Sequence, residues 1–469
     1  MRDDTTVLSA VPDTSPTISI LILGSGFGGV EVLRRLQKKF KNDKDVEITL
    51  ISEDNFFLFT PMLHEVSTGT IETRHIITPM RSFCKNAKFY EAKIESIDLK
   101  SKTVVTNHLV GRQSDPYAWH KITFSYDYLV IALGSKTDFY GMKDIKQQSF
   151  TMKTINDALI LRNHILRMLE QASIEHSNKE LRKSLLTFVV VGGGFGGVET
   201  VGGLNDFVRG TVREYYKDIY MTEIKILLVS AEESILSEID ENLGKYALER
   251  LRDRGVEFIV NTHANGATQN SLKLDNGNII LCHTIVWEAG VTSEHLIKNL
   301  PCTHDKGGRI QTNSYMEVEE YTGVYAVGDC ASIPNPNTGK PYPPTAQHAI
   351  REGRTAAKNI VSSIRSTNGR AGQRHSKKEK LDYKAKGIMA NIGNRNGVAI
   401  IFGVRLHGFI AWFLWRTFYL SNLPVTKKKL KVMSDWTMDL IFKPDVAMLK
   451  GFTRYPIEGK NNDNNNETE

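Results

Sequence analysis

The chain has 469 residues, more than a single hydrophobic core usually organises, so we expect two or three domains. Its composition, 41% hydrophobic and 24% charged, is ordinary for a globular protein. The formal net charge of +7 is small for this length, so charge alone does not indicate a nucleic-acid-binding protein.

The cysteine pattern excludes several kinds of site. No two of the four cysteines form a CxxC pair, which argues against a disulfide scaffold, a zinc knuckle and a thioredoxin-like redox pair. Isolated thiols suit a reducing compartment. The cysteines are Cys84, Cys282, Cys302 and Cys330.

Hydropathy gives no sign of a membrane span. No stretch of 18 uninterrupted apolar residues occurs, so we expect no membrane-spanning helix. The N-terminus lacks an apolar core, so we expect no secretory signal.

The first recognisable pattern along the chain is a β-α-β unit. Residues 18–23 are predicted to form an apolar strand, residues 30–40 an amphipathic helix, and residues 46–52 a second buried strand. The same plan recurs with a strand at 187–191, a helix, and a strand at 223–230. Each unit is typical of a parallel, doubly wound sheet.

Further strand-like and helical segments follow. Residues 126–135 and 322–331 are each predicted as a strand that runs into a loop. Residues 243–260 are predicted as a helix followed by a strand, and residues 279–291 as a further pair of strands. Residues 362–380 are polar and basic, so we expect an exposed connection there.

A glycine-rich loop joins strand to helix in both β-α-β units. In a GxGxxG loop the first glycine permits a tight turn, the second lets the backbone approach a pyrophosphate, and the third lets helix and strand pack closely. The following helix N-terminus offers unpaired N–H groups to phosphates. One such loop is also compatible with a purely structural turn, whereas two predict two bound dinucleotides. The glycines are Gly24, Gly26 and Gly29, then Gly192, Gly194 and Gly197.

Two different dinucleotides are expected, because redox chemistry needs a donor and a relay. A flavin adenine dinucleotide (FAD) can stay bound while a nicotinamide dinucleotide comes and goes. Asp329 directly follows a strand, where its carboxylate can accept a hydrogen bond from a ribityl hydroxyl. Small residues, Ala132 with Gly134 and Ala289 with Gly290, lie where the chain must pass close to a cofactor. Each segment alone also fits a plain strand end.

Together these features resemble the two-dinucleotide-domain flavoprotein oxidoreductases over most of residues 18–360. Three stretches resemble the type II NADH dehydrogenases, the non-pumping NADH:quinone oxidoreductases: "SEDNFFLFTPMLHEVSTGTIETRHIITPMR", "PPTAQHAIREG" and the aromatic C-terminal region. The resemblance implies an α/β fold with two Rossmann-like dinucleotide-binding domains, for FAD and NAD, and a C-terminal amphipathic membrane-binding region.

The expected domain limits follow from this resemblance. We expect disordered ends at residues 1–16 and 459–469. Between them we expect the first part of the FAD-binding domain at 17–155, the NAD(H)-binding domain at 156–300, the second part of the FAD-binding domain at 301–361, the exposed basic connection at 362–380 and the membrane-binding region at 381–458.

The resemblance also implies which residues bind the cofactors. At the FAD site it places Gly24, Gly26, Phe27, Gly28, Gly29, Ser52, Glu53, Thr60, Pro61, Ala132, Gly134, Asp329 and Ala346. At the NADH site it places Gly192, Gly194, Phe195, Gly196, Gly197, Glu232, Ala289 and Gly290. We expect no metal site.

A quinone pocket is implied by "TAQHAIREG", which resembles the family's Ala-Gln-x-Ala motif. It places Gln347, Ala349 and Arg351 in the pocket, with Gln347 catalytic and Arg351 where the family has a second glutamine. The two preceding prolines predict a helix start, and a helix N-terminus directed at the flavin would stabilise the anionic reduced ring. The residues alone also allow Gln347 to be an ordinary first-turn residue.

Glu199 matches the glutamate of the family's GGGxxGVE motif. The resemblance implies a catalytic carboxyl facing the contact between nicotinamide and flavin, where it can assist proton delivery. On physical grounds alone, an acid that complements the helix dipole is the simpler explanation. The family usually has threonine where Gly196 stands.

The choice of nicotinamide cofactor depends on the end of the strand after the second loop. NAD-specific sites commonly place an acid there, on the ribose 2′-hydroxyl. Ser230 occupies that place here, followed closely by Glu232 and Glu233, and no basic residue stands ready for a 2′-phosphate. NADH is therefore favoured over NADPH.

The C-terminal region combines aromatic residues with lysines. An in-plane helix anchored by aromatic side chains, beside lysines for anionic lipid, explains both. An aromatic-rich core helix or a dimer interface would also fit this composition. The aromatic residues are Phe409, Trp412, Phe413, Trp415, Phe418 and Tyr419, and the lysines are Lys427, Lys428, Lys429 and Lys431.

The predicted function is hydride transfer from NADH to FAD and two-electron reduction of a membrane quinone, without proton pumping. The expected partners are NADH, a quinone and a membrane surface on its cytoplasmic side, with no nucleic acid; a homodimer stays open. A sulfide:quinone reductase would need cysteines late in the chain, and none follows Cys330. A reductase of an iron–sulfur carrier and a flavoprotein binding or signalling module also stay open.

Overall fold

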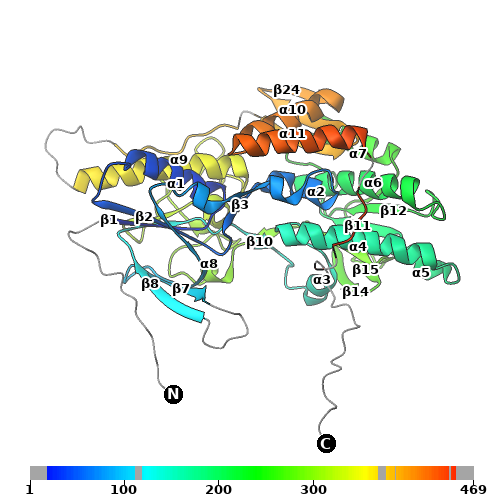
Figure 1. The fold of residues 1–469 in the computed structure, drawn as a ribbon, viewed down its shortest axis with the longest axis horizontal. Helices are drawn as coiled ribbons and strands as arrows, with labels where there is room; N and C mark the ends of the chain where they lie inside the picture. Colours follow the sequence, from blue (N-terminus) through cyan, green and yellow to red (C-terminus); the bar gives the residue numbers. More distant parts are fainter. Residues whose placement is uncertain are drawn as a thin grey trace, which may run out of the picture. The chain divides into compact units, whose positions relative to one another are not determined.

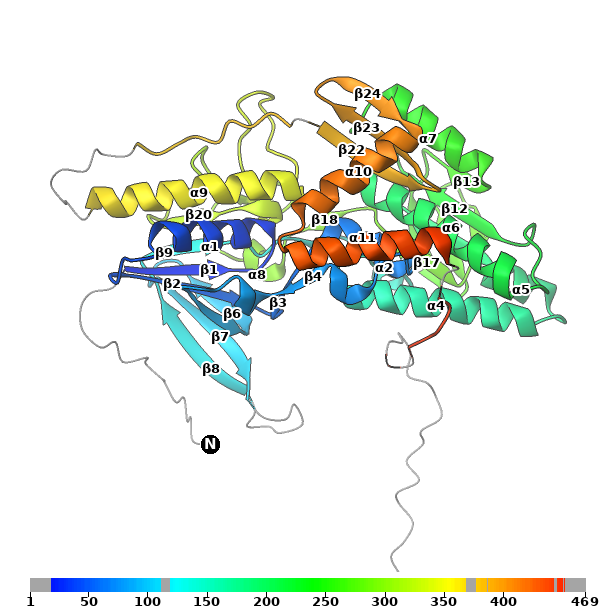
Figure 2. The same cartoon turned by 45° about the horizontal axis from the view of Figure 1, so that its top comes forward.

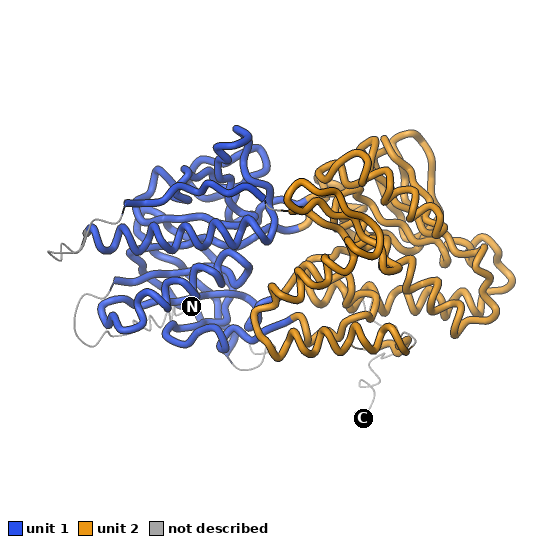
Figure 3. Tube along the Cα trace, turned by 90° about the horizontal axis from the view of Figure 1, so that it is seen from above, with its two compact units in different colours: residues 1–58, 77–136, 291–385 blue, residues 59–76, 137–290, 386–469 orange. Residues whose placement is uncertain are grey.

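The computed structural model describes residues 18–110, 119–367, 377–385, 387–442, 445–449 and 451. The chain divides into two compact units, coloured separately in Figure 3. Unit 1 comprises residues 1–58, 77–136 and 291–385, and unit 2 comprises residues 59–76, 137–290 and 386–469. The two ends predicted to be disordered, 1–16 and 459–469, lie outside the described residues.

The units are divided at 136/137 and 290/291, whereas the sequence predicted limits at 155/156 and 300/301. The segment 59–76, which the sequence assigned to the FAD-binding domain, packs within unit 2. Residues 386–469 also belong to unit 2. The allocation of each cofactor to a domain stays a prediction.

Unit 1 is built on a five-stranded parallel sheet in the order β20-β9-β1-β2-β5. Leu23, the last residue of β1, pairs with Ile51 on one side and Ile131 on the other, which places these strand ends at one edge of the sheet. The predicted strands at 18–23 and 46–52 are confirmed. The strands are β1 (Ile18–Leu23), β2 (Val46–Ser52), β5 (Lys88–Glu91), β9 (Tyr128–Ile131) and β20 (Val324–Ala326).

Helices α1 (Phe27–Lys39) and α9 (Ala346–Thr367) lie side by side in unit 1, as Figures 1 and 2 show. Their backbones approach closely, because a Cβ atom at Gly353 would lie 2.5 Å from the carbonyl oxygen of Gly28. The predicted exposed connection at 362–380 is wrong at its start. Helix α9 continues through it because Ile364, 2% exposed, extends its apolar face.

The shorter strands of unit 1 pair with one another outside the main sheet, most of them antiparallel. Strands β6 (Lys93–Asp98), β7 (Thr103–Leu109) and β8 (Trp119–Ser125) form an antiparallel sheet, and β3 (Phe56–Leu58) pairs with β4 (Ile77–Pro79). The others are η3 (Met80–Ser82), α8 (His295–Lys298), β19 (Ile310–Gln311), η4 (Gly328–Cys330) and β21 (Ala331–Ser332).

Unit 2 contains a four-stranded parallel sheet in the order β13-β12-β11-β17. This confirms the second predicted β-α-β unit. The strands are β11 (Thr187–Val191), β12 (Lys225–Val229), β13 (Val256–Ile259) and β17 (Thr284–Trp287). The helices that accompany them are α3 (Lys143–Gln148), α4 (Ile155–Ile174), α5 (Lys179–Leu185), α6 (Phe195–Tyr215) and α7 (Glu241–Asp253).

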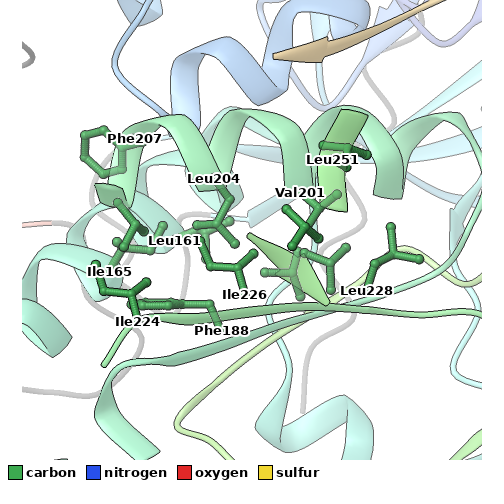
Figure 4. Packing of buried hydrophobic residues seen from close by; sticks show 14 of the residues in the cluster. Leu161, Ile165, Phe188, Val201, Leu204, Phe207, Ile224, Ile226, Leu228 and Leu251 are labelled. Carbon is green, nitrogen blue, oxygen red and sulfur yellow. The ribbon is translucent and has the colours of Figure 1, made fainter. Parts of the chain in front are cut away.

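Alternate residues of these strands point to opposite faces, and both faces are buried. On one face, Phe188 and Ile226 pack with Val201 and Leu204 of α6, as Figure 4 shows. On the other face, Val189 and its alternating neighbours pack against the antiparallel sheet of β14 (Ala264–Thr268), β15 (Ser271–Leu274) and β16 (Ile279–Leu281). The strands predicted at 279–291 therefore exist but belong to two different sheets.

The C-terminal elements of unit 2 are β22 (Gly387–Gly393), β23 (Asn396–Ile401), β24 (Val404–His407), α10 (Gly408–Asn422) and α11 (Thr426–Ile441). Ala390, Ile392 and Val398 contribute to the same core as helix α6. A Cβ atom at Gly202 of α6 would lie 2.6 Å from the carbonyl oxygen of Ile392. Among the described residues, no helix is long and apolar enough to cross a membrane.

Candidate functional site

The first glycine loop lies between β1 and α1 in unit 1. Gly24 has φ +103°, which side chains rarely adopt, and a Cβ atom there would overlap the carbonyl oxygen of Ala132. A side chain at Gly29 would overlap the carbonyl oxygen of Gly24. By contrast, a Cβ atom at Gly26 would meet nothing within 4 Å, so the outer surface of this residue can admit a ligand. Tight packing at the ends and open space in the middle fit a bound pyrophosphate.

Phe27 begins helix α1, and no side chain caps the helix at Gly26. No acidic residue stands in the first turn, so the leading N–H groups remain available to phosphate. Gly28 packs instead on α9 and on Val327. This loop fits one dinucleotide.

The strand ends around this loop carry polar groups. The hydroxyls of Ser25 and Ser52 are 2.7 Å apart, and Glu53 is exposed at the end of β2. Ser135 donates a hydrogen bond of 2.9 Å to the carboxylate of Asp329, which fixes that carboxylate at the end of β20. Gly134 has φ +68° and open space around it.

Glu352 of α9 holds the turn that carries Asp329. Its Oε2 accepts a hydrogen bond of 2.7 Å from the backbone N–H of Gly328. Burial raises the pKa of Glu352 to about 7. Sequence reasoning missed this residue.

The second glycine loop, in unit 2, repeats the geometry of the first. Gly192 has φ +129°, and a Cβ atom there would lie 2.6 Å from the carbonyl oxygen of Glu288. A side chain at Gly197 would overlap the carbonyl oxygen of Gly192. Gly194 is open, with only Glu238 Oε1 at 3.9 Å. Phe195 begins α6 without a side-chain cap, so this loop also fits a dinucleotide.

The expected ribose side of this loop is formed by the end of β12. Ser230 is buried, its hydroxyl accepts a hydrogen bond of 3.2 Å from the N–H of Glu232, and it would touch any side chain at Gly193. Glu232 and Glu233 are exposed.

Ala289 and Gly290 follow β17 and contact a tyrosine. The Tyr140 hydroxyl donates a hydrogen bond of 2.9 Å to the carbonyl of Ala289, and a side chain at Gly290 would overlap that hydroxyl. The Tyr140 side chain thus explains why this position needs a residue without a side chain.

Glu199 lies in α6 one turn beyond the second loop and contacts the C-terminal elements. Its Oε1 accepts hydrogen bonds from the backbone N–H of Asn391, at 3.0 Å, and from the indole N–H of Trp415, at 2.9 Å. Its Oε2 lies 3.9 Å from Nδ1 of His64 in α2 (Leu63–Ser67). The structure therefore places Glu199 between α2, β22 and α10.

Burial shifts the pKa values of Glu199 and His64 in opposite directions. It raises the pKa of Glu199 to about 8, against the opposing effect of its two hydrogen bonds, and lowers the pKa of His64 to about 4. At neutral pH the carboxyl is mostly protonated and the imidazole is neutral. The Nε2 atom of His64 is buried and has no hydrogen-bond partner among the described residues.

A second buried carboxyl, Glu65, stands next along α2. Its Oε2 accepts a hydrogen bond of 3.2 Å from the indole N–H of Trp436 in α11, and its Oε1 lies 3.7 Å from Arg416. The Arg416 guanidinium lies over the rings of Trp412, at 4.3 Å, and Trp436, at 4.5 Å. Burial raises the pKa of Glu65 to about 7.

The predicted quinone residues lie at the start of α9 in unit 1. The hydroxyl of Tyr383 donates a hydrogen bond of 3.4 Å to Oε1 of Gln347, and the Arg351 guanidinium lies 5.0 Å from the centre of the Tyr383 ring. Ala349 is buried beside Gly28, so in this unit it serves helix packing. Ala346 begins the helix, which confirms the predicted start.

Thr60 and Pro61 form the 3-10 turn η1 (Thr60–Met62), which belongs to unit 2. The first loop belongs to unit 1. Their assignment to the flavin site stays a prediction.

Comparison with known proteins identifies the family. The pyridine nucleotide-disulphide oxidoreductase family matches residues 18–353, and the NDH2 C-terminal domain matches residues 385–445. A probable NADH dehydrogenase of Dictyostelium discoideum is 31% identical over 430 residues, which cover 91% of this chain and 90% of that protein. The chain belongs to the type II NADH dehydrogenases.

Two further matches of this type II NADH dehydrogenase are consistent with the family. A type II NADH:quinone oxidoreductase of Mycobacterium tuberculosis is 31% identical over 433 residues, covering 90% of this chain and 88% of that protein. The structure of NDH2 from Plasmodium falciparum in complex with NADH matches with a TM-score of 0.82 at 22% identity, covering 92% of this chain and all of that one. This likeness supports the fold.

Sequence reasoning missed the buried residues around Glu199 in this type II NADH dehydrogenase. His64 and Glu65 stand inside an otherwise apolar stretch, Met62 to Val66, which was a signal for buried polar function. Nothing local marks Trp415 or Trp436 as their partners. Among the described residues, no cluster of His, Cys, Asp and Glu could hold a metal ion.

Proposed function

We infer that this chain is an FAD-dependent NADH:quinone oxidoreductase that does not move protons across a membrane. The observation that carries this inference is the presence of two complete dinucleotide loops in a chain that also matches the NDH2 C-terminal domain. When bound, FAD accepts a hydride from NADH and supplies two electrons to the quinone.

The residues of each loop would hold one dinucleotide. Gly26 and the N-terminus of α1 would receive the FAD pyrophosphate, and the Asp329 carboxylate, fixed by Ser135, would accept from the ribityl chain. Gly194 and the N-terminus of α6 would receive the NADH pyrophosphate. The acids that follow Ser230 disfavour a 2′-phosphate, which supports NADH over NADPH.

Glu199 is the proposed proton-carrying residue. With both donors bonded to Oε1, the proton of the neutral acid resides on Oε2, which faces Nδ1 of His64. A carboxyl whose pKa is about 8 can give up a proton near neutral pH and regain it. Glu199→Gln keeps the acceptor for both donors but carries no exchangeable acid, so we expect turnover to fall roughly 100-fold.

The quinone head group is proposed to lie near the start of α9. Gln347, held at its oxygen by Tyr383, keeps its amide N–H groups available to a quinone carbonyl. Arg351 adds a positive charge close by. Ala349 would serve the pocket only through packing.

Membrane docking through the C-terminal helices is proposed from their exposed apolar side chains. On α10, Phe409, Ile410 and Phe413 are 59%, 60% and 55% exposed, whereas Trp412 and Trp415 are buried. We call Phe409, Ile410 and Phe413 the outer row of α10. Of the predicted aromatic anchors, Trp412 and Trp415 instead belong to the core. A surface this apolar is typical of a membrane or protein interface, and the nearby lysines favour anionic lipid.

The cytoplasmic side of the membrane and a homodimer both stay predictions. Sulfide:quinone chemistry is disfavoured by the cysteines. A sulfide:quinone oxidoreductase of Aquifex aeolicus shares the fold, with a TM-score of 0.65 at 19% identity. This chain has no cysteine after Cys330, so the fold likeness does not extend to that chemistry.

Anaerobic spectroscopy of the purified protein tests the proposed function. NADH is expected to bleach a flavin absorption band, and a short-chain quinone is expected to restore it. Sulfide is the matched control and should leave the band unchanged. A colourless protein, or bleaching by sulfide alone, would contradict the proposal.

A further inference from the structure

Glu288 is a carboxyl group at the second loop that neither the dinucleotide cradle nor the proton-carrying role of Glu199 requires. It follows β17 directly, and its backbone N–H donates a hydrogen bond of 2.8 Å to the carbonyl of Val191, the last residue of β11. This bond fixes Glu288 beside the point where β11 enters the loop.

The side chain of Glu288 packs on the first turn of α6. A Cβ atom at Gly196 would lie 2.7 Å from its Oε2, so the carboxyl occupies the space that a side chain at 196 would need. Its Oε1 accepts a hydrogen bond of 3.3 Å from the hydroxyl of Thr200, one turn further along. The carboxyl group therefore lies against the helix end that offers N–H groups to phosphate.

We propose that Glu288 faces the phosphates of the bound nicotinamide dinucleotide and takes up a proton when that dinucleotide binds. The inference rests on the proposed function, because it takes the second loop as the nicotinamide dinucleotide site. A pyrophosphate at the N-terminus of α6 and a carboxylate on the first turn would carry like charges within about one helical turn, roughly 5 Å. The neutral acid removes that repulsion.

Three charged groups act on Glu288 from other parts of the unit. Lys153, just before α4, lowers the pKa of Glu288 and Asp157 within α4 raises it, while Glu199 of α6 and Glu288 repel one another as like charges. Burial is the largest influence and raises the pKa of Glu288 to about 7. Without ligand the group is therefore half ionised near neutral pH, and the phosphates raise its affinity for the proton further.

The linkage has a definite sign. Because the complex holds the proton more tightly than the free protein, the dissociation constant of the dinucleotide rises with pH above about 7. We expect roughly a tenfold rise between pH 6.5 and pH 8.5, and an uptake of part of a proton on binding at pH 7.5.

Calorimetric titration of the FAD-loaded protein with ADP-ribose tests this. ADP-ribose carries the pyrophosphate without the nicotinamide, so no redox reaction intervenes. Titrations from pH 6 to pH 9, in two buffers of different ionisation enthalpy, give both the affinity and the number of protons taken up. Adenosine lacks the phosphates, and its affinity should not change with pH.

Glu288→Gln keeps the acceptor for Thr200 but cannot ionise. Its affinity for ADP-ribose should be independent of pH, about tenfold tighter than the parent protein at pH 8.5, and without proton uptake. Glu249→Gln is the matched control, because Glu249 is an exposed acid of the same unit on α7 with no place in the dinucleotide site; it should retain the proton uptake.

Proton uptake that persists in Glu288→Gln, or an ADP-ribose affinity independent of pH in the parent protein, would overturn the inference. The parent measurement stands by itself if the variant does not fold. Flavin bleaching by NADH together with a pH-independent affinity would refute only the role of Glu288. A protein that neither binds ADP-ribose nor is bleached by NADH would refute the proposed function itself.

Discussion

The indole N–H of Trp415 donates a hydrogen bond of 2.9 Å to Oε1 of Glu199, which ties helix α10 to the helix that begins at the second glycine loop. The bond favours the ionised carboxylate and so opposes the effect of burial on its pKa. A tryptophan of the C-terminal region thereby lowers the proton affinity of the proposed proton-carrying residue, which burial raises.

Trp415→Phe is expected to raise the pKa of Glu199 further. A hydrogen bond to a charged group contributes about 1.5–3 kcal/mol, which corresponds to a shift of roughly one to two pKa units. If turnover needs the protonated acid, its alkaline limit moves to higher pH by that amount. The pH profile of NADH:quinone turnover measures it, with Trp412→Phe as the control, since Trp412 lies over Arg416. Equal profiles for the two variants would contradict the prediction.

Matched alanine substitutions can show which glycine loop binds FAD and which binds the nicotinamide dinucleotide. Gly26→Ala and Gly194→Ala should both fold, because neither position has a positive φ and each has open space beside it. Gly26→Ala is expected to lose FAD, measured as flavin absorbance per protein. Gly194→Ala should keep FAD and bind ADP-ribose at least tenfold more weakly. Loss of flavin in Gly194→Ala would reverse the assignment of the loops.

The stability of the protein should depend on pH through Glu199. The folded-state pKa, about 8, exceeds the ordinary value of 4.5, so the folded protein binds this proton more tightly than the unfolded chain. This contribution to stability is fully present below about pH 4.5 and is lost as pH rises through about 8. Glu199→Gln removes this dependence on pH. In urea unfolding, the stability of the variant relative to the parent protein should therefore be higher at pH 8.5 than at pH 5. The exposed Glu249→Gln serves as control.

Much of the fold follows from local patterns, whereas the surroundings of Glu199 do not. The strands beside both loops are short apolar runs, each followed directly by a glycine. The pattern of apolar residues and the glycine that marks the turn are therefore enough to predict them. Trp415 and Asn391 approach Glu199 from about 200 positions away in the chain, and no local rule pairs them. The position of Glu288 also depends on long-range packing, since it fills the space left by Gly196.

Glu65 should be important for the packing of α11. Glu65→Ala removes the anion beside the buried Arg416 and the acceptor of Trp436, so we expect a loss of about 3 kcal/mol in the free energy of unfolding. Glu65→Gln keeps an acceptor for Trp436 and should cost about 1 kcal/mol. Urea unfolding at pH 8 compares them. Equal losses would show that the hydrogen bond from Trp436 contributes nothing, because both variants lack the carboxylate charge.

Membrane docking can be tested on the outer row of α10. Replacing Phe409, Ile410 and Phe413 together by serine should weaken binding to anionic vesicles by roughly 3 kcal/mol, about 100-fold, if each side chain buries part of its surface in lipid. Vesicle sedimentation measures the partition. The control replaces Ile174 and Tyr220, which are 80% and 71% exposed but lie outside the C-terminal helices. A similar loss in the control would argue against a specific docking surface.

The close fit between Gly202 and Ile392 limits how this protein can be rearranged by recombination. A chimaera that receives its last eighty or so residues from a relative would set a foreign β22 against the native α6, where even one methyl group at 202 meets backbone. We expect such exchanges to succeed only when α6 is transferred together with the C-terminal strands. The helix that follows the second glycine loop and the C-terminal end of the chain would then have diverged as one inherited block.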